Sequence, residues 1–198
     1  MRLPPVPGIT PVSLGSVEHT AAELLAALHR IKGRDAARDP ALAIAASQTA
    51  ELAHERGAGL VATIEHPGAD PALLVAWVLP LDRRLDPDSA TDLGHHLADA
   101  GGPDIREVTR AQTAAGYPAV IAERIPPDLV GAQLQVLVFD VAQPRVAVFT
   151  LHSTTGRGWL EISALAGRFV SGLRFSGAES RSATARRRSG TPARSAPR

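Results

Sequence analysis

The residues best suited to catalysis in this sequence are a histidine followed directly by hydroxyl side chains, at His152, Ser153 and Thr154. A histidine can act as general base toward a neighbouring hydroxyl, which then becomes a nucleophile. A hydrolase of this kind also needs an acid that orients the histidine and an oxyanion hole, and the sequence has no Gly-x-Ser-x-Gly segment. A hydrolase is therefore one functional alternative, and a polar cluster between a strand and a helix cap is the simpler interpretation.

Asp92, His95 and Asp99 form a candidate metal site, because positions i, i+3 and i+7 lie on one face of a helix. Two carboxylates and an imidazole can hold a divalent cation. His96 lies about 100° around the helix from His95, so the two histidines do not share a site. A solvated helix face accounts for the same residues, and we expect no metal there.

Several kinds of cofactor site are unexpected for this sequence. There is no cysteine, which excludes disulfides, thiolate nucleophiles and cysteine-ligated zinc or iron–sulfur sites. Glycines flank Arg157 before a helical segment, where free N–H groups can bind an anion. Neither a Gly-x-Gly-x-x-Gly segment nor a phosphate-binding P-loop is present, so we expect no cofactor.

A basic C-terminal segment contains Arg186, Arg187 and Arg188. From position 176 onward there are six arginines and one glutamate, a net charge of +5, so the rest of the chain carries −4 of the total of +1. Residues 176–198 hold no large apolar side chain, which predicts a disordered tail. The triplet is a possible interaction site, but the acidic body and the 4% aromatic content argue against a specific nucleic-acid partner.

Apolar residues make up 44% of the 198 residues, enough for the core of one domain. Helical spacing predicts helices over 17–31, 39–56, 89–101 and 157–172. Asp39 and Pro40 suit the cap and first turn of the second helix, and Thr154 or Thr155 suits the cap of the last. Strands are expected over 59–66, 72–81, 104–111, 115–125, 133–141 and 145–151.

The hairpin over 134–151 is apolar on both faces of its two strands. A strand with one face in water alternates apolar and polar residues, so this pattern predicts that both sides of the sheet are covered. The short connection Ala142–Gln143–Pro144 makes the two strands antiparallel neighbours. A sheet and helix packed in this way can leave a cleft, and Trp77, Phe139 and Trp159 are the candidate residues to line it for a small ligand.

Three segments carry a resemblance to a known fold: "GYPAV" at 116–120, "QLQVLVFDVAQPRVAVFTLHST" at 133–154 and "LAGRFVSGLRF" at 165–175. With their order of elements, they resemble the PsbP-like fold over roughly residues 59–175. The chain also resembles small actinobacterial proteins in which two helices precede such a sheet. The resemblance implies an antiparallel sheet between helices and a binding or accessory role, and it carries over no catalytic residue.

The sequence therefore predicts an α+β fold, with an antiparallel sheet sandwiched between helices, two N-terminal helices and a disordered basic tail. Residues 1–16 are expected to form an extended lead-in, 17–175 a single domain and 176–198 the tail. No apolar run is long enough to span a membrane, and we expect a cytoplasmic protein. We expect a non-catalytic module that binds another protein, with a small-ligand-binding protein and a hydrolase as the alternatives.

Overall fold

A computed structural model describes residues 1–33, 39–86, 88–102, 104–125 and 131–176. These residues form an α+β fold with four helices and one seven-stranded antiparallel sheet, ordered β1-β2-β3-β7-β6-β5-β4. The helices are α1 (Val17–Lys32), α2 (Pro40–Glu55), α3 (Ser89–Ala100) and α4 (Trp159–Ser171). The strands are β1 (Ile9–Pro11), β2 (Leu60–Ile64), β3 (Ala72–Pro80), β4 (Ile105–Gln112), β5 (Pro118–Arg124), β6 (Ala132–Asp140) and β7 (Arg145–Ser153).

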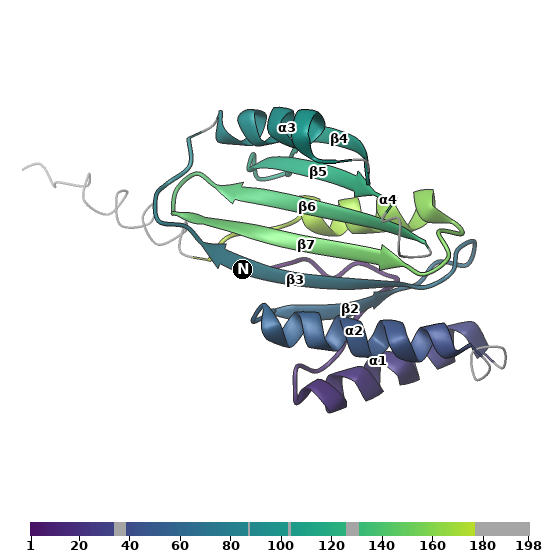
Figure 1. The fold of residues 1–198 in the computed structure, drawn as a ribbon. Helices are drawn as coiled ribbons and strands as arrows, with labels where there is room; N and C mark the ends of the chain where they lie inside the picture. The colour runs from purple at the N-terminus through teal and green to yellow at the C-terminus, as the bar shows by residue number, and fades with distance from the viewer. Residues whose placement is uncertain (34–38, 87, 103, 126–130, 177–198) are drawn as a thin grey trace, which may run out of the picture.

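The sheet lies between helices, as the sequence predicts. Figure 1 shows α1 and α2 beside β2, α3 over β4 and β5, and α4 behind the sheet. On the α4 face, Ile162 and Phe169 of the helix join the same core as Phe149 of β7. Burial of each such side chain contributes roughly 1.5–3 kcal/mol, so α4 is firmly attached to the sheet.

Two separate helical units cover the opposite face. Leu24 and Leu28 of α1 and Leu42 of α2 pack with Leu73 and Val75 of the sheet. At the other end of the strand order, α3 packs on β4 and β5. Because α2 and α3 cover different strands, the side chains of β6 between them are only half-buried at Gln133, Gln135 and Leu137.

The first two helices begin and end where the sequence predicts. Asp39 caps α2, because its carboxylate accepts the N–H of Ala41 at 3.1 Å, and Pro40 is the first helical residue. Ser16 caps α1, and the helix ends at Gly33 with φ of 70°, a conformation that suits glycine. The ion pair between Lys32 and Asp39 holds the end of α1 next to the start of α2.

The prediction for the start of α4 is wrong. The helix begins at Trp159, after Gly158 in the left-handed region with φ of 70°, and neither Thr154 nor Thr155 caps it. The hydroxyl of Thr155 instead donates to Asp70 in the turn between β2 and β3 at 2.8 Å. The chain therefore uses Thr155 to hold two distant segments together rather than to start the helix.

The lead-in has more structure than expected. Residues 9–11 form β1, which pairs with β2, and Arg2 forms an isolated antiparallel bridge with Arg174. The first residues of the chain thus lie beside the segment that follows α4. The expected disordered tail falls almost wholly on 177–198, outside the described residues. Within the described ranges, no helix combines the length and the apolar character that crossing a membrane requires.

Candidate functional site

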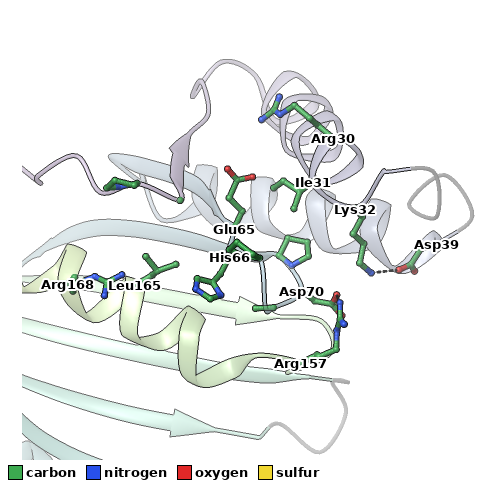
Figure 2. Close-up of a pocket in the computed structure, with 15 residues that line it drawn as sticks. Arg30, Ile31, Lys32, Asp39, Glu65, His66, Asp70, Arg157, Leu165 and Arg168 are labelled. Atoms are coloured by element: carbon green, nitrogen blue, oxygen red, sulfur yellow. Dashed lines mark hydrogen bonds and ion pairs between the residues drawn. The ribbon is translucent and has the colours of Figure 1, made fainter.

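A cavity of about 1020 Å³ opens where β2 turns into β3. The turn over 65–71 lies between the last turn of α1 and helix α4, and Pro7, Gly8, Asp39 and Arg157 complete the lining. Figure 2 shows these side chains coming from segments that are far apart in the sequence. The size matches the upper end of known small-molecule sites. We call this cavity the turn cleft.

Two glycines allow the chain to form the turn cleft. Gly8 has φ of 89°, and a Cβ there would lie 2.6 Å from the carbonyl oxygen of Glu65. Gly158 has φ of 70°, and a Cβ there would overlap Ala69 and lie 2.8 Å from the carbonyl oxygen of Gly68. Both positions therefore bring backbone against the β2–β3 turn more closely than another residue permits.

Two ion pairs occupy one side of the turn cleft. Lys32 Nζ lies 3.1 Å from Asp39 Oδ2 and joins the end of α1 to the start of α2. Arg157 Nη2 lies 2.6 Å from Asp70 Oδ1. The hydrogen bond from Arg157 holds the pKa of Asp70 below its usual range, and the Thr155 hydroxyl reinforces this shift. The same contact raises the pKa of Arg157.

Four other ionisable side chains line the turn cleft without an ion pair among the described residues: Arg30, Glu65, His66 and Arg168. In Figure 2 the Glu65 carboxylate lies toward α1, and the His66 ring lies toward α4 with Leu165 and Arg168. The described lining includes no serine, threonine, tyrosine or cysteine. The turn cleft thus offers charges, hydrogen bonds and apolar contact for binding, but no hydroxyl or thiol nucleophile.

His152 lies elsewhere, on the face of the sheet that α2 covers. It lines a cavity of about 150 Å³ with Thr49 and Thr150. Its Nδ1 is buried without a partner among the described residues, and burial lowers the pKa of the ring. Neighbouring side chains of a strand point to opposite faces, so Ser153 lies on the α4 side, where its hydroxyl accepts the N–H of Gly156 at 3.1 Å. The geometry therefore does not bring His152 and Ser153 together for catalysis.

The three aromatic residues expected to line one cleft are separated by the sheet. Phe139 is buried against the α3 side, where Trp77 also packs. Trp159 lies on the α4 side and donates its indole N–H to Glu123 at 2.6 Å. The three side chains do not share one cavity, and none of them lines the turn cleft.

The remaining candidates are not brought into one site. Asp92, His95, His96 and Asp99 are exposed on α3, and the part of the chain that the structure describes contains no group of three side chains placed to hold a metal ion. Arg186, Arg187 and Arg188 lie outside the described residues. Arg157, which stands between two glycines in the sequence, lines the turn cleft.

No protein-family model matches this chain, and searches of curated proteins and of solved structures also found no match. The resemblance to the PsbP-like fold therefore stays a prediction.

Proposed function

We propose that this protein is a non-catalytic binding module that holds a small ligand in the turn cleft. The observation that carries the proposal is the convergence of Arg30, Lys32, Arg157 and Arg168 with Glu65 on one cavity of about 1020 Å³. Four separate chain segments supply these charges, namely the end of α1, the β2–β3 turn, the loop before α4 and α4 itself, and the described lining adds no hydroxyl or thiol nucleophile. A site built in this way suits recognition more than covalent chemistry.

A thermal-shift screen of small metabolites tests this function. A ligand at one hundred times its Kd stabilises the folded state by about 2.7 kcal/mol, which is readily measured. Arg168→Trp places an indole in the turn cleft and removes a lining charge, whereas Ala164→Trp places the same side chain at an exposed position of α4 outside the lining. The proposal predicts at least one compound that stabilises the wild type and Ala164→Trp but not Arg168→Trp. A screen in which every stabilising compound acts equally on all three proteins contradicts it.

Protein interaction, the first function expected from the sequence, is a second proposal. It is supported by β4, a strand of eight residues at the end of the sheet, which pairs only with β5 among the described residues. An extended segment of a partner can add to such an edge. Leu160 and Thr109 line the same small hollow, and Leu160 is 79% exposed, which offers that segment an apolar contact.

Site-specific photo-crosslinking in the native host tests this second function. A photoreactive residue at Thr109 is expected to give a discrete adduct with one protein, and the same residue at the exposed Ala98 of α3 is the control. Equal labelling from both positions contradicts pairing at β4. The cytoplasm is the proposed location, and a PsbP-like relationship is the proposed ancestry, both as expected from the sequence.

A further inference from the structure

We infer that the ligand of the turn cleft is an anion, and that its acidic group binds on the α4 side between His66 and Arg168. This inference rests on the proposed ligand-binding function and names the class of ligand. Carboxylates and phosphates share the required chemistry, which is a compact negative charge that accepts several hydrogen bonds.

The first support is the distribution of charge within the turn cleft. Lys32 pairs with Asp39 and Arg157 pairs with Asp70, so the charges cancel within each pair. The charges left over are Arg30 and Arg168 against Glu65. Arg168 therefore has no carboxylate partner among the described residues, and its guanidinium is available to a ligand.

The second support is the hydrogen bonding of His66. The N–H of Gly68 donates to His66 Nδ1 at 3.2 Å, so Nδ1 is the acceptor. In the neutral imidazole the proton then lies on Nε2, and this nitrogen is a donor. The Gly68 N–H thus leaves Nε2 of the His66 side chain as a hydrogen-bond donor on the α4 side of the turn cleft, where Arg168 also lies.

The third support is the position of the carboxylates that line the turn cleft. Figure 2 places the Glu65 carboxylate toward α1, away from the His66 ring. The other described carboxylates in the lining already have partners, since Asp39 pairs with Lys32 and Asp70 accepts from Arg157 and Thr155. Among the described lining residues, an anion on this side meets donors and no unpaired carboxylate. Leu165 and Pro7 line the same region and offer apolar contact for the carbon part of the ligand.

Titrations of the full chain with citrate, inorganic pyrophosphate and spermidine, followed by ¹H–¹⁵N NMR, test the class of ligand. Citrate represents carboxylates, pyrophosphate represents phosphates, and spermidine is the cationic comparison. We expect one of the anions to shift the amide signals of residues 66, 68–70 and 165–168. Arg168→Glu is expected to weaken that binding by about tenfold or more, the scale of a charge-assisted hydrogen bond.

Arg56→Glu is the matched control, because it changes the net charge equally at an exposed residue beyond the far end of α2. Its binding is expected to stay within about twofold of wild type, since a distant exposed charge is screened. His66→Phe is expected to lose affinity and His66→Gln, which keeps a donor, to recover most of it. The better of the two anions identifies the source of the acidic group.

Three results overturn the inference. If spermidine shifts the same amide signals and neither anion does, the cleft is a cation site, and the proposed ligand-binding function still stands. Equal losses in Arg168→Glu and Arg56→Glu would show a general charge effect. Anion binding elsewhere on the chain would refute the site. The proposed function fails separately, when no compound in the thermal-shift screen distinguishes Arg168→Trp from Ala164→Trp.

Discussion

Arg157 Nη2 lies 2.6 Å from Asp70 Oδ1, and this contact joins the loop before α4 to the turn between β2 and β3. The Asp70 side chain is 14% exposed and the Arg157 side chain is 72% exposed, so water screens one half of the pair. A contact of this kind adds little stability. Its consequence is positional, because it sets the distance between two walls of the turn cleft.

Asp70→Asn is expected to lower Tm by about 1–3 °C at pH 7, the scale of a partly exposed ion pair in a domain of this size. Because the folded state lowers the pKa of Asp70, its contribution is present above the unfolded pKa of about 3.9 and is lost as the pH falls through the folded value. The difference from wild type should therefore shrink at pH 3. Calorimetry at pH 7, 5 and 3 measures it, with Asp99→Asn on the exposed side of α3 as control. An equal loss at pH 7 and pH 3 would refute this role of the carboxylate.

Gly158→Ala and Gly57→Ala separate backbone strain from the close approach at the cleft. Both glycines have positive φ, 70° and 59°, and a methyl group at Gly57 meets nothing within 4 Å. We expect Gly57→Ala to cost about 1–2 kcal/mol from the left-handed backbone alone. Gly158→Ala adds a clash with Ala69 and should cost at least about 1 kcal/mol more, as overpacking does. Urea unfolding measures both, and similar losses would show that α4 does not press against the turn.

Arg145 is expected to be critical for stability at the end of the β6–β7 hairpin. Asp140 is 2% exposed and is paired with Arg145 at 2.7 Å, while the guanidinium lies 5.0 Å from the ring centre of Phe175. Arg145→Met leaves a buried carboxylate without its partner and should cost about 3–5 kcal/mol. Adding Asp140→Asn removes the charge but keeps an oxygen for the N–H of Ala142, so the double variant should recover part of the loss. Chemical denaturation of the variants checks this order, and a double variant weaker than Arg145→Met would contradict it.

Trp159→Phe tests the link between α4 and β5. The indole N–H donates to Glu123 at 2.6 Å, and the Glu123 side chain is 17% exposed. Loss of a donor to a partly buried carboxylate is expected to cost about 1–3 kcal/mol. Glu123→Gln removes the charge, so Trp159→Phe in that background should cost less. A double-mutant cycle in urea gives the coupling, and additive effects would show that the hydrogen bond contributes nothing.

The fold was accessible from the sequence where local chemistry and pattern agreed. Asp39 and Pro40 defined the start of α2, and the two-sided apolar pattern of 134–151 predicted helices on both faces of the sheet. The structure has α4 on one face and α2 and α3 on the other, where β6 stays half-buried between them. A strand over 104–111 was also expected, and it forms β4, the last strand of the sheet, whose register with β5 shifts between Ile105 and Glu107. The α+β class followed from these elements together.

The site was not accessible in the same way. Arg30, His66 and Arg168 are separated by up to 138 positions and belong to no spacing pattern, so only the packing of α4 beside the β2–β3 turn brings them to one cavity. β1 was missed because the prolines around it obscure a short strand that exists only through its pairing with β2. The start of α4 was misplaced because Thr155 serves Asp70, a contact between distant segments.

The central claim is tested most directly by a crystal structure of the chain soaked with the compound whose increase in Tm is largest in the wild type and absent in Arg168→Trp. The account predicts electron density for that compound in the turn cleft, with an acidic group between the His66 ring and the Arg168 guanidinium. Density for it in the small cavity beside Thr150 and His152, or on the open edge of β4, with the turn cleft empty, would contradict the account.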